Sequence, residues 1–291
     1  MAPAPASISV AILSYNRCDE LRRTLGILAR TPELWHEVIV ADNASADGTP
    51  AMVRAEFPTA RLIETGGNTG IAGSNLAYSA ATGAWVLSLD DDSAPVAETF
   101  APLSRELAAG CPAAAIALSV RRGWGPPRAP TAGALLAPSY GFSSAGVLFN
   151  RRALTEVGTY DPELFLFTNE LHWTARALLA GWPILKADSA CVVHRSAPAN
   201  RSSARHAYHY TRNLLLFLLR YAPAPLARPL AARYFQRAAA YTVLHRTGIY
   251  LRAMRDAFAL LRRNPTARRP LRPEQLALIN PDWRAGFAYL G

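Results

Sequence analysis

Short apolar runs that stop abruptly at polar residues constrain the fold of this chain more than any other feature. Residues 7–13 form a β-branched and aliphatic run that ends at Ser14, and residues 37–41 form a second run that ends at Asp42. A third run, residues 84–89, leads directly into an aspartate cluster. Runs of this length and composition are typical of buried strands.

Segments with helical spacing separate these strands. Residues 19–29 place leucines about one turn apart among arginines, and residues 50–57 and 71–81 also favour helix. The short run 61–64 predicts a further strand. This alternation predicts an α/β fold, a mostly parallel sheet flanked by helices. Ligands bind beyond the carboxyl ends of the strands in such a sheet, so we expect the polar clusters to share one crevice.

The next part of the chain is less regular. Residues 110–138 have a Gly/Pro-rich centre and predict a loop or a pair of strands over the site. Strands are expected at residues 145–149 and 190–193, and a helix at residues 170–180. The last of these strands leads to His194.

The composition changes after residue 195, where arginine, alanine and bulky apolar residues follow long helical patterns interrupted by prolines. We expect a disordered tail at residues 1–6, an α/β domain at residues 7–195 and a mainly helical region at residues 196–291. At 291 residues, the chain can bury a sizeable core.

The formal net charge is +10 and comes almost wholly from arginine, because Lys186 is the single lysine. This balance favours an anionic partner, such as a nucleotide diphosphate or a membrane surface, or it reflects genomic composition. We recognise no nucleic-acid-binding module and expect no nucleic-acid partner. The arginine-rich helices also contain Leu, Phe and Tyr and could rest on an anionic membrane.

The three cysteines, Cys18, Cys111 and Cys191, are far apart and indicate neither a disulfide framework nor a zinc site. They favour a reducing compartment. The longest strongly apolar run, residues 214–219, is too short to cross a bilayer. We therefore expect a cytoplasmic protein, with peripheral contact at the inner face of the membrane as an alternative.

Three consecutive aspartates, Asp90, Asp91 and Asp92, follow a predicted buried strand. Their charges repel one another unless a cation or solvent offsets them, and their oxygens suit Mg²⁺ or Mn²⁺. The alternative is a solvated acidic turn that caps a helix starting near Pro95. The chain has neither a GxGxxG nor a GxxxxGK[ST] loop, which counts against oxidoreductases and P-loop proteins.

Several ordered segments together carry a resemblance to a known family. They read SVAILSYNRCDELRRTLGIL, VIVADNASADGT, ETGGNTGIAGSNLAYSAATGAWVLSLDDDS, ARALLAGWPILKADSACVVH and, farther on, YHYTRNLLLF. The chain resembles family 2 glycosyltransferases with the GT-A fold, and its C-terminal part resembles rhamnosyltransferase-like members. The resemblance implies an inverting transfer from a UDP- or dTDP-linked sugar to a hydroxyl of a saccharide, a lipid-linked saccharide or a natural product.

The resemblance also implies roles for single residues. The implied donor-binding positions are Ser14, Tyr15, Asn16, Asp42, Asn43, Asn68, Gly70, Asp90 and Asp91. Asp42 and Asn43 would lie at the base or ribose, and Asp90 at the ribose. Asp92 and His194 would bind the divalent metal, Mg²⁺ or Mn²⁺.

The acceptor hydroxyl needs a group that removes its proton during an inverting transfer. Counting back from Arg176 and Gly181 aligns Asn169-Glu170-Leu171-His172 with the acidic segment of the family, and Glu170 becomes the candidate base. The segment departs from the family pattern, because Asn169 and His172 stand where acids are usual. The alternatives are that Glu170 only favours the start of a helix, or that the protein binds nucleotide sugars without catalysis.

A basic and aromatic run, residues 205–212, lies in the helical region. It could serve recognition of the diphosphate or of the acceptor. His206 and His209 are three residues apart and could bind a metal, but a solvated helix face is the better interpretation.

Overall fold

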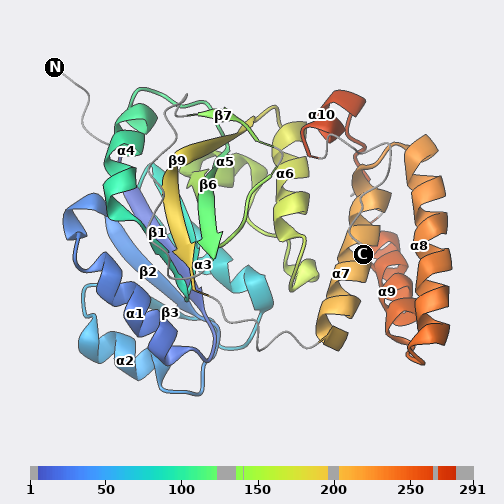
Figure 1. The fold of residues 1–291 in the computed structure, drawn as a ribbon, viewed down its shortest axis with the longest axis horizontal. Helices are drawn as coiled ribbons and strands as arrows, with labels where there is room; N and C mark the ends of the chain where they lie inside the picture. The colour runs from blue at the N-terminus through green and yellow to red at the C-terminus, as the bar shows by residue number, and fades with distance from the viewer. Residues whose placement is uncertain (1–5, 123–135, 140, 196–202, 265–267, 280–291) are drawn as a thin grey trace.

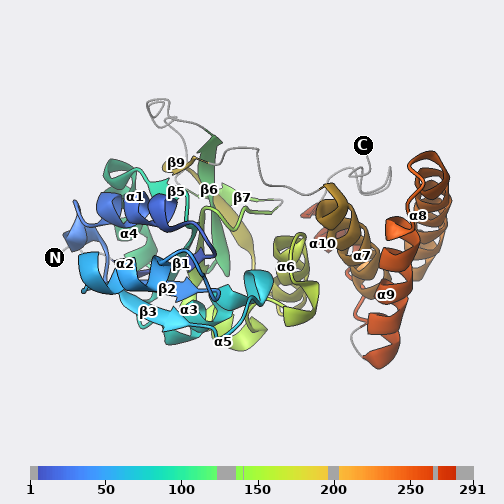
Figure 2. The same cartoon turned by 90° about the horizontal axis from the view of Figure 1, so that it is seen from below.

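The computed structural model describes residues 6–122, 136–139, 141–195, 203–264 and 268–279 (Figure 1). An α/β unit occupies one end of the long axis, and the C-terminal helices stand at the other end (Figures 1 and 2). The expected α/β fold with a helical C-terminal region is confirmed. Among the described residues, no helix is long and apolar enough to span a bilayer.

The described strands form one nine-stranded sheet, in the order β3-β2-β1-β4-β8-β6-β9-β5, with β7 paired to β9. Its first half is parallel and contains β1 (Ile8–Ser14), β2 (Glu37–Asp42), β3 (Arg61–Glu64) and β4 (Trp85–Asp90). β8 runs antiparallel to β4 and β6, so the sheet as a whole is mixed. The remaining strands are β5 (Ser93–Pro95), β6 (Ala115–Arg122), β7 (Ala137–Pro138), β8 (Val147–Asn150) and β9 (Ile184–His194).

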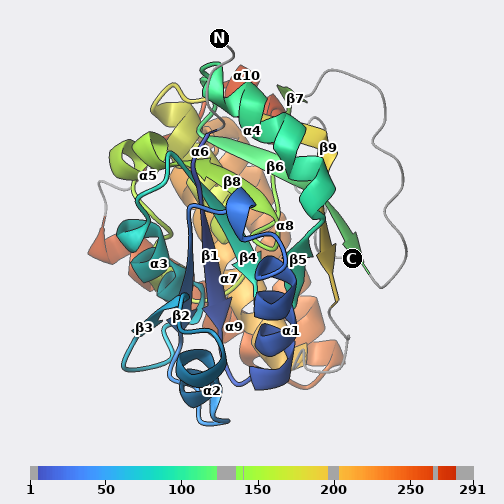
Figure 3. The same ribbon diagram turned by 90° about the vertical axis from the view of Figure 1, so that its left-hand side faces the viewer.

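Helices cover both faces of the sheet (Figure 3). One face packs against α1 (Cys18–Leu28), α2 (Thr49–Glu56) and α4 (Phe100–Ala108). The other face packs against α3 (Ser74–Ala80), α5 (Arg151–Val157) and α6 (Asn169–Leu179). In α1 the residues Leu21, Leu25 and Leu28 recur at helical spacing and are all buried, so one apolar stripe faces the sheet.

The C-terminal helices are α7 (Ser203–Tyr221), α8 (Ala224–Leu244), α9 (Ile249–Arg263) and α10 (Pro273–Ala277). α7 joins them to the α/β unit, because Leu214, Phe217 and Leu218 share a buried cluster with Ala175 and Leu178 of α6. The division at residue 195 stays a prediction. The expected tail lies outside the described residues except for Ala6, whose N–H donates to the Ser104 carbonyl at 3.0 Å.

The structure corrects the prediction of an irregular segment over the site. β6 (Ala115–Arg122) is an inner strand between β8 and β9, and β6 does not pair with β7. The alanines at its start are fully buried, and their small side chains weaken the strand signal in the sequence. β9 begins at Ile184 rather than at residue 190, since Lys186 and Asp188 interrupt its apolar pattern. The Gly/Pro-rich centre of the segment lies outside the described residues.

Candidate active site

Three parallel strands bring their polar ends together. In the register of the sheet, Ser14 of β1 lies beside Asp42 of β2, and Leu13 lies beside Asp90 of β4. Hydrogen bonds join the loops beyond these strands, since the Asn16 N–H donates to Ser45 Oγ at 2.9 Å and Asn16 Oδ1 accepts from the Ala46 N–H at 2.7 Å. The expected polar clusters therefore lie at one edge of the sheet.

The aspartates after β4 are mostly buried, which contradicts the alternative of a solvated acidic turn. Asp91 and Asp92 are 6% and 1% exposed. A cation, Arg17, lies at the start of α1, with Nη2 2.8 Å from Asp92 Oδ2 and Nε 3.4 Å from Asp91 Oδ1. A short β5 follows the aspartates, and the 3₁₀ helix that starts near Pro95, at Ala97–Thr99, is preceded by Val96, so the aspartates do not cap it.

Asp91 faces the end of β1. Its Oδ2 accepts from Ser14 Oγ at 3.3 Å and from the Tyr15 N–H at 3.4 Å, and its carbonyl accepts from Thr24 Oγ1 at 2.7 Å. These bonds fix the aspartate turn to β1 and α1. Asp91 thus shapes the site, and its expected contact with the donor stays a prediction.

The three carboxylates differ in pKa. Burial raises the pKa of Asp91 to about 7, against the opposing charge of Arg17. Desolvation also raises the pKa of Asp90 to about 6, and the charges of Asp92 and Glu170 add to this effect, while His194 opposes it. Burial acts in the same direction on Asp92, but His194 and Arg17 outweigh it and hold the pKa of Asp92 below its ordinary value. Negative charge is therefore crowded here, which favours a bound cation.

His194 reaches the aspartates because β5 and β9 pair antiparallel, with Ser93 opposite His194. Its Nε2 lies 3.0 Å from Asp92 Oδ1 and 3.7 Å from Asp90 Oδ2. One ligand atom from each of Asp90, Asp92 and His194 lies within 4.8 Å of the other two. Two carboxylates and an imidazole form a donor set that fits Mn²⁺ or Mg²⁺, with imidazole favouring Mn²⁺.

Asp42 carries a carboxylate oxygen that no described residue binds. The residue is 1% exposed, and Oδ2 accepts from the Ser45 N–H at 2.9 Å. Its Oδ1 is buried and has no hydrogen-bond partner among the described residues. A buried acceptor without a partner is costly, and a ligand N–H or hydroxyl would satisfy it. Nearby, Tyr15 is 42% exposed and free to stack on a planar ring.

Asn43, Asn68 and Gly70 bind one another. Asn43 Nδ2 donates to Asn68 Oδ1 at 3.1 Å and to the Gly70 carbonyl at 2.9 Å, and Asn68 Oδ1 also accepts from the Gly70 N–H. Gly70 has a φ of 63°, and a Cβ there would lie 2.1 Å from the Phe165 carbonyl oxygen. The glycine is therefore required by the close approach of the segment before α6. Direct contact of these three residues with a donor stays a prediction.

Glu170 lies in the first turn of α6, near the aspartates. Its Oε1 accepts from Ser144 Oγ at 2.6 Å and from the Ser144 N–H at 3.3 Å. The Ser144 hydroxyl also lies 3.1 Å from Tyr160 Oη. The Ser144 carbonyl accepts from Ser88 Oγ at 3.0 Å, and Ser88 lies on β4 two residues before Asp90, so Ser144 links Glu170 to the strand that carries the aspartates. His172 instead faces α7, with Nε2 3.0 Å from the Asn213 carbonyl oxygen.

The backbone before Glu170 is strained. Phe165, Phe167 and Thr168 have φ values of 62°, 64° and 60°, a region that costs such residues about 1–3 kcal/mol each. Phe165 is the centre of a tight three-residue turn, in which the Leu166 N–H donates to the Leu164 carbonyl at 2.7 Å. Contacts elsewhere must hold this turn.

Comparison with known proteins identifies the family. The family model described as Glycosyl transferase family 2 matches residues 9–172, more than half of the chain. The chain belongs to this family. The resemblance expected from the sequence is confirmed, and the protein is a glycosyltransferase.

Two curated relatives differ in how much of their length this glycosyltransferase covers. It is 28% identical over 256 residues to the N-acetylglucosaminyl-diphospho-decaprenol L-rhamnosyltransferase of Mycobacterium tuberculosis (strain ATCC 25618 / H37Rv), covering 72% of this chain and 83% of the relative. It is 36% identical over 87 residues to the succinoglycan biosynthesis protein ExoO of Rhizobium meliloti (strain 1021), covering 29% of this chain and 25% of the relative.

Solved structures agree on the fold. GalNAc-T7 with UDP, GalNAc and Mn²⁺ matches 90% of this chain and 58% of its own at a TM-score of 0.59 and 15% identity. The structure of Staphylococcus aureus TarS with UDP-GlcNAc matches 94% of this chain and 83% of its own, at a TM-score of 0.59 and 17% identity. The structure of the mannosyltransferase PcManGT of Pyrobaculum calidifontis, with GDP-Man and Mn²⁺, matches 98% of this chain and 82% of its own, at a TM-score of 0.57 and 21% identity. The GT-A fold of this glycosyltransferase is thereby confirmed.

Sequence reasoning missed two residues of the glycosyltransferase site. Arg17 directly follows Ser14-Tyr15-Asn16, so its position in the strand-end motif was the available signal. Ser144 has no comparable signal, because its contact with Glu170 spans 26 residues and depends on how β8 approaches α6.

Proposed function

We propose that this glycosyltransferase moves a sugar from a UDP- or dTDP-linked donor to an acceptor hydroxyl, with inversion, and uses a divalent cation. The observation that carries the proposal is the cluster of Asp90, Asp92 and His194, whose ligand atoms lie within 4.8 Å of one another at the carboxyl end of β4. Mn²⁺ in the structures of GalNAc-T7 and PcManGT supports the proposal.

The nucleotide would bind between the loops after β1 and β2. The buried, unused Oδ1 of Asp42 would accept a hydrogen bond from the base or ribose, and Tyr15 would lie against the ring. A uracil or thymine N–H and a ribose hydroxyl are donors of the kind that this oxygen needs. This arrangement would place the diphosphate toward the aspartates.

Asp90, Asp92 and His194 would hold the cation, whose positive charge would stabilise the departing diphosphate. Arg17 holds Asp91 and Asp92 in place with its guanidinium. The acceptor oxygen attacks the anomeric carbon while the bond from that carbon to the diphosphate oxygen breaks. Glu170 takes the acceptor proton, and Ser144 keeps the Glu170 carboxylate oriented through Oε1.

A thermal-shift screen tests the donor assignment. Binding to the folded state raises the melting temperature by mass action. We expect a UDP- or dTDP-sugar to raise it in the presence of Mn²⁺, with a smaller rise without the metal and a smaller rise in Asp42→Asn. If no nucleotide sugar stabilises the protein with Mn²⁺, the proposed function is wrong. Binding without transfer across a broad acceptor panel would support the alternative of a nucleotide-sugar-binding protein.

We further propose a lipid-linked saccharide as the acceptor and peripheral contact with the inner face of the membrane. The name of the M. tuberculosis relative describes a decaprenol-linked acceptor. Residues 224–263, which comprise α8, α9 and the turn between them, contain eight arginines and one aspartate, a net charge of +7. Phe235, Val243 and Leu244 of α8 are 50%, 80% and 72% exposed. Arginines beside exposed apolar side chains are the chemistry that binds anionic lipid surfaces.

Vesicle sedimentation checks the membrane contact. We expect the protein to bind vesicles that contain anionic lipid, to bind neutral vesicles weakly, and to be released as salt rises, because the charges are screened. The double variant Val243→Ser/Leu244→Ser should bind several-fold less, with an unchanged melting temperature, since both side chains are exposed. Equal recovery in the supernatant with and without anionic vesicles would contradict the proposal.

A further inference from the structure

The strained turn before Glu170 is held by side chains from α7, a helix outside the family-model match. Asn213 is fully buried and faces the turn. Its Nδ2 lies 2.9, 2.7 and 3.0 Å from the carbonyl oxygens of Leu164, Leu166 and Phe167, which share its two N–H donors. One amide group therefore holds three carbonyls of a four-residue segment.

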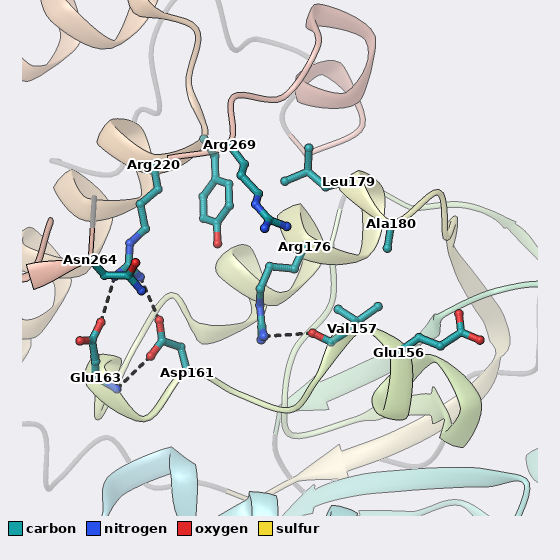
Figure 4. A pocket seen from close by; sticks show the side chains of 11 residues that line it. Glu156, Val157, Asp161, Glu163, Arg176, Leu179, Ala180, Arg220, Asn264 and Arg269 are labelled. Carbon is teal, nitrogen blue, oxygen red and sulfur yellow. Dashed lines mark hydrogen bonds and ion pairs between the residues drawn. The ribbon is translucent and has the colours of Figure 1, made fainter. Parts of the chain in front are cut away.

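Two arginines of α7 hold the residues just before the turn. Arg212 Nη2 donates to the carbonyls of Glu163 and Leu164, both at 2.7 Å, and its Nε donates to Asn213 Oδ1 at 2.8 Å. Two turns farther along α7, Arg220 forms ion pairs of 2.9 Å with Asp161 and with Glu163 (Figure 4). Arg212 belongs to the basic run of residues 205–212 but is 9% exposed, so it is buried between α7 and the turn.

Aromatic contacts extend the same interface. The His209 ring stacks on Phe165 with centroids 5.2 Å apart, and the His206 ring lies 4.5 Å from that of Phe167. The two histidines therefore pack on the turn, and both are half-buried rather than on a solvated helix face. We call Arg212, Asn213 and Arg220, with the backbone segment that they hold, the α7 clamp.

The α7 clamp connects to both halves of the crevice. The Phe165 carbonyl accepts from the Ile71 N–H at 2.7 Å, so the turn also supports the loop that contains Asn68 and Gly70. At its other end the turn leads through Thr168 into the first residues of α6, which contain Glu170. Any relaxation of the turn would move the Glu170 carboxylate relative to the aspartates.

We propose that the α7 clamp sets the position of Glu170 for catalysis and that Asn213 is its central positioning residue. This inference rests on the proposed function of Glu170 as the base. Three strained residues cannot keep their conformation unless surrounding contacts over-determine it, and Asn213 supplies more of those contacts than any other side chain named here. Small displacements of a reacting group have large kinetic effects, so the clamp acts on the rate of transfer more than on donor affinity.

Asn213→Asp is the decisive variant, because it keeps the shape and the acceptor for Arg212 but places a carboxylate oxygen against three carbonyl oxygens. We expect kcat to fall about a hundredfold, with the donor KM changed within about twofold. Leu218→Ala is the matched control, since Leu218 is a buried residue of α7 that packs on α6 and not on the turn. It should lower the melting temperature as much as Asn213→Asp and leave kcat within about twofold.

A double variant with Glu170→Gln distinguishes a positioning role of Asn213 from a general loss of stability. In a Glu170→Gln background, Asn213→Asp should lower kcat by no more than about twofold further, because the base is already absent. If Asn213→Asp does not fold, Arg220→Met serves instead, because the two carboxylates that it leaves, Asp161 and Glu163, have side chains that are 23% and 38% exposed and border a cavity of about 470 Å³ through which water can reach them (Figure 4). It should lower kcat by about tenfold, with the same coupling.

The outcomes distinguish the two proposals. If Glu170→Gln alone keeps full kcat, the assignment of the base is wrong, and the clamp has no catalytic target. If Glu170→Gln loses activity while Asn213→Asp and Arg220→Met keep kcat, the clamp proposal is wrong and the base stands. Additive losses in the double variant would show that Asn213 acts elsewhere and would also overturn the clamp proposal.

Discussion

Asp92→Asn should lower kcat by about three orders of magnitude and leave the protein folded. Asp92 is 1% exposed, and its two oxygens face His194 and Arg17. The asparagine has the same shape but no charge to offer a cation. The steady-state rate of sugar transfer with saturating donor and Mn²⁺ measures the effect.

Asp188→Asn is the control for Asp92→Asn. Asp188 lies on β9, like His194, but its side chain is 58% exposed and pairs with Lys186. Exposed pairs of this kind contribute little, so activity and melting temperature should stay unchanged. If Asp92→Asn retains more than about a tenth of the wild-type kcat, the cation is not held as we propose.

Glu170→Gln should lower kcat by about two to four orders of magnitude, because the acceptor proton then has no base. Donor affinity should change little, since the loops after β1 and β2 would hold the nucleotide. Ser144 would still donate to the glutamine Oε1 oxygen, so the local structure should persist. Single-turnover transfer and donor binding, measured on the same preparation, separate these two effects.

Glu156→Gln is the control for Glu170→Gln. Glu156 lies on α5, pairs with Arg152 on the surface and contributes nothing to the crevice. It should leave kcat unchanged. If Glu170→Gln and Glu156→Gln have similar kcat values, Glu170 is not the base. Its carboxylate would then only stabilise the start of α6.

The sequence predicts the parallel half of the fold well because its signals are local. β2 and β3 were predicted to within one residue, as apolar runs bounded by turn formers. The inner strand β6 and the first half of β9 were missed. Alanines and single polar residues give weak strand signals there, and the neighbouring strands, not the local sequence, decide those conformations.

The residues of the site also divide into those with a local sequence signal and those placed by distant contacts. Asp92 and His194 were expected to hold the metal and Asp90 to contact the ribose, whereas the structure brings ligand atoms of all three within 4.8 Å of one another. Ser144 and Asn213 could not be assigned roles, because each acts through a contact with a residue far away in the sequence. Such contacts follow from tertiary packing, which hydrophobic periodicity does not encode.

The most direct test of the central claim is the electron paramagnetic resonance signal of Mn²⁺ titrated with protein in the presence of UDP or dTDP. We predict that the wild-type chain and Asp188→Asn remove the sharp signal of free Mn²⁺ as they bind it, and that Asp92→Asn leaves most of it. Equal loss of the free signal with Asp92→Asn and with the wild-type chain would contradict a cation held by Asp90, Asp92 and His194.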